Sequence, residues 1–198
     1  MVISSDSQRD LFSDTGALGF VQILLAEMHD DLLGKVARFR QLTDLSKTLG
    51  PGGTMIHGGE VAYTAWTEAR NSFIHGNYIA TVMLCQSLAE NLLAAYIDTD
   101  LEAEKLPKRV SFNDTIRRCV SKGVFDKSFS GELITMMNIR NPLSHYRDLE
   151  DPSNLSRRVL DSRLPAIAHL MGDASFALAI AIKLLSLPPF WLSGETLK

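Results

Sequence analysis

Apolar residues recur at steps of three or four along most of this chain, and this period limits the folds that it can adopt. It places apolar side chains on one face of an α-helix. No segment shows the sustained alternation of apolar and polar residues that marks a half-buried strand. The sequence therefore predicts an all-α helical bundle without a sheet. In the first run, over residues 16–49, the apolar positions are Leu18, Val21, Leu25, Met28, Leu32, Val36, Phe39, Leu42, Leu45 and Leu49.

This first run predicts one long N-terminal helix that ends in the turn Gly50-Pro51-Gly52-Gly53. Its apolar stripe has a spacing close to a heptad repeat. We expect the stripe to pack against the rest of the domain, and a seam between two copies of the chain is the alternative.

The remaining helical pattern covers residues 59–187 and predicts a helical core. A break is expected at His75-Gly76-Asn77, and the following segment from Tyr78 to Ile97 is rich in Ala, Leu and Met, as a central helix would be. Ser111 is expected to cap the start of a further helix. Other helix boundaries are expected near Gly123, Ser130, Pro152, Pro165 and Leu187.

Composition predicts one soluble domain over residues 1–198, since 45% of the residues are apolar and 22% are charged. Cys85 and Cys119 lie in helical runs and are expected to be reduced core thiols, and with no apolar leader this favours a cytoplasmic location. The most apolar segment, residues 164–187, carries His169, Asp173 and Lys183. Because such groups are costly in lipid, we expect a buried helix and no membrane partner.

The charge of the chain is uneven. The formal net charge is -3, yet the segment from Lys105 to Arg147 has nine Lys and Arg against three Asp and Glu. A local basic surface can bind phosphate groups even where the whole protein is acidic. This segment also contains the group of polar residues that is best suited to a functional site.

That group is Arg140-Asn141-Pro142-Leu143-Ser144-His145. On an ideal helix Arg140 and His145 would point roughly 140° apart. Because Pro142 has no N–H and disfavours a helical conformation at Asn141, we expect the helix to bend or restart there and to turn Arg140 toward His145. An arginine, an asparagine and a histidine so placed suit phosphodiester chemistry.

Two other segments place an arginine four to six residues before a histidine. Arg163 and His169 lack a polar residue after the arginine, and His169 is expected to be a satisfied core or boundary histidine. Arg70 is followed by asparagine and precedes His75 near the predicted helix break. We treat this second copy as structural or, at most, as support for the later site.

Together these residues resemble the HEPN superfamily of small α-helical bundles. The form Arg-Asn-x3-His at residues 140–145 matches the family motif, and residues 73–93, with an aromatic-Gly-aromatic opening and Glu90, resemble its early helix. The resemblance covers roughly residues 63–147. It leaves the long N-terminal helix and much of the C-terminal helix outside the shared part.

The resemblance implies a metal-independent endoribonuclease without a cofactor, of the kind found among toxins and defence proteins under a regulatory partner. His145 would transfer a proton, Arg140 would stabilise phosphate charge, and Asn141 would orient the histidine or bind the phosphate. The products would carry 2′,3′-cyclic phosphate and 5′-hydroxyl ends. Two subunits would share the cleft as a homodimer. The alternative is a non-catalytic module for helical interaction or for nucleotide or RNA binding, in which Arg140 caps a helix or pairs with Glu90 and His145 bonds a backbone carbonyl.

Residues around the motif are expected to contact RNA. Tyr146 could stack on a base, although a tyrosine in this position often simply packs. The basic side chains would follow the phosphate backbone, and their alternative is an ordinary solvated helix face. These basic side chains are Arg117, Arg118, Lys122 and Arg147.

Overall fold

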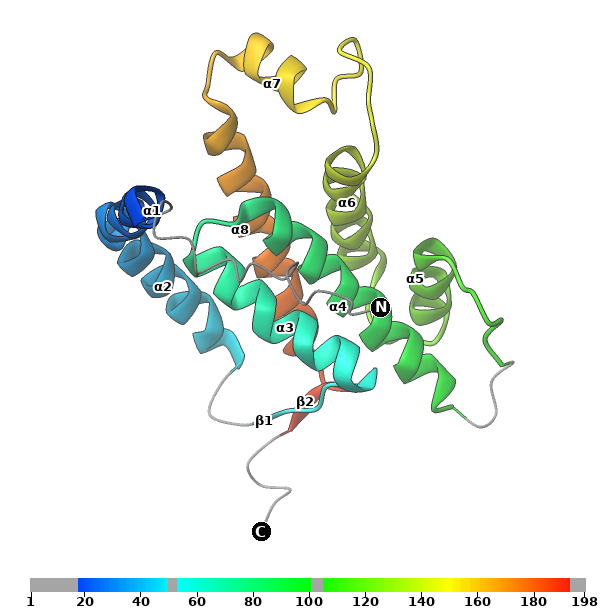
Figure 1. Cartoon of the computed structure of the whole chain (residues 1–198). Coiled ribbons are helices and arrows are strands. Elements are labelled where there is room, and N and C mark those ends of the chain that lie inside the picture. The colour runs from blue at the N-terminus through cyan, green and yellow to red at the C-terminus, as the bar shows by residue number, and fades with distance from the viewer. Residues whose placement is uncertain (1–17, 50–52, 101–104, 193–198) are drawn as a thin grey trace, which may run out of the picture. The chain divides into compact units, whose positions relative to one another are not determined.

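The computed structural model describes residues 18–49, 53–100 and 105–192, and within them the chain is all-α, as predicted. Eight α-helices account for nearly all of the regular structure (Figure 1). The chain divides into two compact units, residues 1–37 and 38–198. One domain was expected over residues 1–198, and the two units are described separately below.

The first unit contains helix α1, Leu18–Asp30, and the first turns of helix α2, Leu32–Ser46. The single helix expected at 16–49 is therefore interrupted at Asp31, while residues 16, 17 and 50 lie outside the described residues. The hydrogen bonds continue across the interruption, from Asp31 N–H to the Glu27 carbonyl at 3.2 Å and from Lys35 N–H to the Asp31 carbonyl at 2.9 Å. Aspartate has low helix propensity, which accounts for a local irregularity without loss of the helical path.

The second unit holds the remaining helices. The central helix α4, Tyr78–Asp98, forms contacts with α3, α5, α6 and α8. The unit also contains the rest of α2 and a short 3-10 turn at Lys47–Leu49. The other helices are α3 at Gly59–Ile74, α5 at Phe112–Ser121, α6 at Lys127–Ser144, α7 at Leu155–Ser162 and α8 at Ala166–Leu185.

Helices α3 and α4 form an antiparallel hairpin around a tight turn at residues 75–77, where the break was predicted. Gly76 has a φ of 79°, which an L side chain rarely adopts. The turn is held from α2, because Arg38 Nε donates to the Ile74 carbonyl at 2.8 Å and the Arg38 guanidinium lies 6.0 Å from the centre of the Tyr78 ring. This second half of α2 also buries Leu42.

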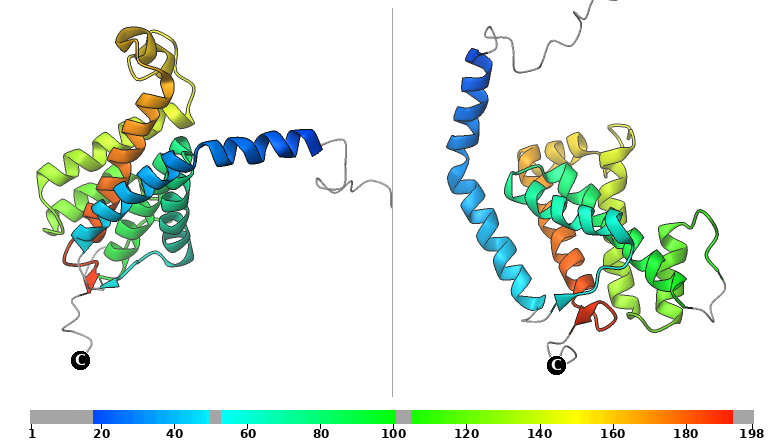
Figure 2. Two further views of the ribbon diagram at one scale, coloured as in Figure 1. Left: turned by 90° about the vertical axis from the view of Figure 1, so that its left-hand side faces the viewer. Right: turned by 60° about the horizontal axis from the view of Figure 1, so that its bottom comes forward.

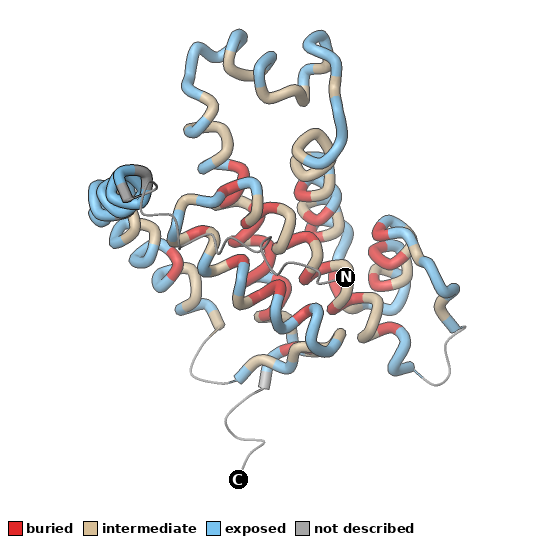
Figure 3. The backbone as a smooth tube through the Cα atoms, in the orientation of Figure 1, coloured by how far each residue is buried: buried red, intermediate tan, exposed pale blue. Residues whose placement is uncertain are grey.

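Burial is concentrated on α4 and α8, and these two helices carry much of the red tube in Figure 3. Both helices are long and apolar enough to cross a membrane by length and composition alone, but core helices meet the same criterion. The charged groups of α8 have partners: Lys183 Nζ lies 2.6 Å from Glu132 of α6, and Asp173 binds Arg158 of α7. In this structure α8 is a core helix of the bundle, as predicted.

Cys85 and Cys119 are free and buried, as expected for core thiols. Burial raises the pKa of each thiol to about 12, because the thiolate would lose its hydration. Both are therefore protonated at neutral pH.

Two short strands pair at one end of the core, although no sheet was predicted. Strand β1, Gly53–Thr54, pairs antiparallel with β2, Trp191–Leu192, and the pair is visible in the right-hand view of Figure 2. Met55 N–H donates to the Phe190 carbonyl at 2.8 Å, and Trp191 Nε1 donates to the Leu49 carbonyl at 2.9 Å. These contacts tie the chain before α3 to the end of α8.

The buried ion pair between α7 and α8 is expected to stabilise the fold. Arg158 donates two hydrogen bonds, at 2.7 and 2.9 Å, to Asp173, whose side chain is 8% exposed. Arg158→Met should lower the free energy of unfolding by about 2 to 3 kcal/mol, since it leaves a buried carboxylate unpaired. Arg157→Met is the matched control, because the Arg157–Asp161 pair is about half exposed and should contribute less than about 0.5 kcal/mol. Urea unfolding measures both, and equal losses would contradict this assignment.

Candidate functional site

The candidate site lies at the C-terminal end of α6. The helix starts with Asp126, whose side chain accepts a hydrogen bond from Phe129 N–H at 2.8 Å. Its buried face is formed by Phe129, Leu133 and Met136, at steps of four and three residues. Arg140 comes four residues after Met136 and thus lies on the same face by helical periodicity. It is half-buried.

Pro142 does not break the helix, so the expected bend or restart that would turn Arg140 toward His145 does not occur. The α-helix continues through Pro142 to Ser144, and His145 is the first residue after it, with φ -130° and ψ 139°. His145 N–H still donates to the Asn141 carbonyl at 3.0 Å, which closes the last turn. Pro142 removes only the one bond that an N–H at this position would donate to the Asn138 carbonyl. The helix end, and not the proline, changes the direction of the chain.

The three motif side chains have no polar partner among the described residues. Arg140 and Asn141 are half-buried and His145 is exposed. None of the three side chains makes a hydrogen bond or ion pair with another residue in the described ranges 18–49, 53–100 and 105–192. Glu90, considered as a partner for Arg140, instead accepts a hydrogen bond from Gln86 Nε2 at 2.6 Å. Side chains with unused donors and acceptors are available to a ligand.

The basic residues expected to bind phosphate largely have acidic neighbours. Arg117 is paired with Asp114 and Lys122 with Asp100. Arg147 Nε lies 3.7 Å from Asp151. Arg118 is half-buried on α5. All three pairs are at least one-third exposed on average, so each contributes little to stability and can be exchanged for a phosphate contact.

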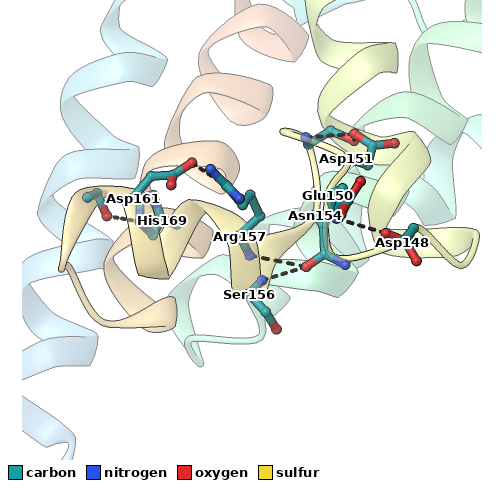
Figure 4. Close-up of polar contacts among 10 residues, drawn as sticks. Asp148, Glu150, Asp151, Asn154, Ser156, Arg157, Asp161 and His169 are labelled. Carbon is teal, nitrogen blue, oxygen red and sulfur yellow. Dashed lines mark hydrogen bonds and ion pairs between the residues drawn. The ribbon is translucent and has the colours of Figure 1, made fainter.

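The chain after His145 forms a short ordered connection to α7 (Figure 4). Asp151 accepts hydrogen bonds from Ser153 Oγ at 2.6 Å and from Ser153 N–H at 2.8 Å. Asn154 caps α7 by accepting from Ser156 and Arg157 N–H, and its own Nδ2 donates to the Arg147 carbonyl at 2.8 Å. The loop is therefore held by its own polar groups.

Tyr146 follows His145 directly and is 88% exposed. The alternative in which this tyrosine simply packs is therefore wrong. An exposed aromatic ring beside an exposed imidazole can stack on a nucleobase.

A cavity of about 270 Å³ lies beside α6 but on a different face from Arg140. It is lined from α6 by Asn138 and Pro142, and from α7 and α8 by Arg158 and Asp173. Asn138 and Arg140 lie roughly 160° apart around the helix. The cavity therefore does not bring Arg140 and His145 together.

The residues considered as support for the site have contacts elsewhere. The Arg70 guanidinium lies 4.9 Å from the centre of the Trp66 ring, and its buried Nε has no hydrogen-bond partner among the described atoms. His75 ends α3 at the α3–α4 turn and is exposed. No hydrogen bond, ion pair or ring contact within the described ranges joins Arg70, His75 or Glu90 to the end of α6.

Sequence reasoning missed two polar pairs near this end of the bundle. One is Arg158 with Asp173, for which the only local signal was an aspartate in the apolar run of α8. The other is Ser162 Oγ with His169 Nε2, at 2.8 Å. His169 was expected to be satisfied within the fold, and this contact confirms it. Both pairs connect α7 to α8 across a turn, which sequence periodicity does not predict.

Comparison of the chain with protein families, with curated proteins and with solved structures found no match in any of the three. The resemblance to the HEPN superfamily therefore remains a prediction based on residues 63–147.

The hydrogen bonds of the loop after the motif can be tested through the pKa of Asp151. Bonds from the Ser153 hydroxyl and then the Ser153 N–H, together with the nearby Arg147 charge, lower the pKa of Asp151. This contribution to loop stability is present above the ordinary carboxyl pKa and is lost as pH falls through the lowered value. Ser153→Ala should raise the pKa of Asp151 toward its ordinary value in an NMR titration. An unchanged pKa would show that the Ser153 hydroxyl does not bind the carboxylate in solution.

Proposed function

We propose that this protein is an endoribonuclease of the HEPN type that cleaves RNA without a metal ion. The observation that carries the proposal is the set of three polar residues within six positions at the end of α6, Arg140, Asn141 and His145, whose side chains form no hydrogen bond or ion pair with other described residues. Arg140 is only half-buried, so its guanidinium can bind a phosphate from solvent with two parallel hydrogen bonds.

In the proposed reaction the ribose 2′-oxygen attacks the adjacent phosphorus, and the bond from phosphorus to the 5′-oxygen breaks. His145 takes the proton of the 2′-hydroxyl, and Arg140 binds the phosphoryl oxygens as their negative charge increases. Asn141 binds the phosphate or the imidazole. The products are a 2′,3′-cyclic phosphate and a 5′-hydroxyl.

The departing 5′-oxygen also needs a proton. A single chain offers one motif histidine at the end of α6, and a second copy of the chain would supply another. We therefore propose that the active form is a homodimer with both motifs at one RNA-binding cleft. Tyr146 would stack on a base next to the cleaved bond, and Arg117, Lys122 and Arg147 would exchange their acidic neighbours for phosphates. Arg118 would contribute a further phosphate contact.

The proposal is tested with the purified full chain and a single-stranded RNA of mixed sequence in the presence of EDTA. Cleavage should give cyclic phosphate ends, detected by mass spectrometry. His145→Ala should slow cleavage at least about 100-fold, because general acid–base catalysis contributes that much. Arg140→Lys keeps the positive charge but not the bidentate geometry, and it should also lose most of the activity.

Two exposed residues outside α6 and outside the basic segment 105–147 provide matched controls. His29→Ala and Arg157→Ala should cleave RNA at the wild-type rate. Equal rates in wild type and His145→Ala would indicate a contaminating nuclease and contradict the proposal, as would intact RNA with every variant.

A second candidate is a non-catalytic module that binds RNA, nucleotides or another helical protein. It is favoured by the ion pairs of Arg117, Lys122 and Arg147, which reduce the positive charge near the motif. Under this function the wild type leaves RNA intact. A nucleotide would instead raise the melting temperature, and Arg140→Ala would abolish the increase.

A further inference from the structure

Helices α1 and α2 expose a row of large apolar side chains. The exposed fractions are 39% for Val21, 59% for Leu25, 53% for Leu32 and 40% for Val36. Within the unit of residues 1–37, the described residues form only α1 and the first turns of α2, so no other described element of that unit covers this row. Large apolar side chains that are exposed along one helix face can mark an interaction site.

The spacing of the row favours another helix as the occupant. Leu18, Val21, Leu25, Met28 and Leu32 follow one another at steps of three, four, three and four residues, as the core positions of a coiled coil do. The next core position is Lys35. A single polar residue at a core position lowers the stability of a coiled coil but fixes its register.

The charges along the same helices favour a second copy in antiparallel orientation. Glu27, Asp30 and Asp31 form an acidic segment, and Lys35 and Arg40 follow it as a basic segment. Arg38, between them, is bound within its own chain at the α3–α4 turn. In a parallel pair of identical helices, like charges would lie side by side. In an antiparallel pair with its twofold axis between Leu32 and Lys35, each acidic segment lies beside the basic segment of the other copy.

We propose that two copies of this protein associate through an antiparallel pairing of their α1–α2 segments. The occupant of the apolar row is therefore the same row of a second molecule. Because Lys35 stands at a core position, the pairing is reversible and depends on protein concentration. The proposal is independent of RNA cleavage, and it is tested by measuring the molecular mass of the protein in solution.

Sedimentation of the full chain over a wide concentration range tests the association. The wild type should form a dimer, and Leu32→Lys should weaken dimerisation at least about tenfold, since it places a second positive charge beside Lys35 of the other copy. Leu160→Lys is the matched control: Leu160 is 64% exposed on α7, outside the row. Circular dichroism should show the same helix content for all three proteins. A wild type that stays monomeric, or a Leu32→Lys variant that dimerises like wild type, would overturn the proposal.

The orientation is tested with charge exchange and cysteine variants. Asp31→Lys and Lys35→Asp should each weaken the dimer, and the double exchange should restore it. Under mild oxidation Leu32→Cys, near the twofold axis, should form a disulfide-linked dimer, whereas Leu25→Cys should not. Cross-linking of both would indicate a parallel pair and overturn the antiparallel assignment.

A lipid surface is the other class of occupant. If monomeric protein co-sediments with vesicles of phosphatidylcholine and phosphatidylglycerol and Leu32→Glu abolishes this binding, the row is a lipid-binding surface and the proposal of a second copy is wrong.

Discussion

The structure depends on burial of the apolar surface of α4. This helix is contacted by α3, α5, α6 and α8, and side chains over about half of its circumference are buried. An apolar helix of this length is stable in water only when other helices cover it, and the free energy of that burial is what assembles the second unit. The tight turn at Gly76 and the short β1–β2 ladder then fix where the covering helices begin and end.

Packing against this core also determines what the end of α6 can do. Arg140 continues the face that buries Leu133 and Met136, while His145 has left the helix and lies in solvent. A rigid helix therefore holds the guanidinium and the peptide at Asn141, and the imidazole stands at the start of a loop with hydrogen bonds of its own. In the proposed site the guanidinium would be the fixed anion-binding group and the imidazole the more accessible proton-transfer group. It is also consistent with a site that is completed by a second molecule.

The distribution of charge limits how such a site could bind RNA. The basic segment of residues 105–147 has aspartate neighbours at Arg117, Lys122 and Arg147. Exposed pairs of this kind are weak and are screened by salt, so their cations remain available to a polyanion with many phosphates. An isolated phosphate would compete less well for them. The charge pattern thus favours a long ligand over a small one.

The sequence by itself determined the fold class and most helix boundaries, because period, capping residues and glycine turns are local. The central helix from Tyr78, the cap at Ser111 and the division near Pro165 are all confirmed. The motif Arg140-Asn141-Pro142 was also found in the sequence, but its geometry was not. Only the tertiary structure decided that the helix passes through Pro142, because packing of α6 against α4 and α8 outweighs one missing hydrogen bond. It likewise decided which charges are paired, since Arg158 with Asp173 and Lys122 with Asp100 meet only after distant segments have packed together.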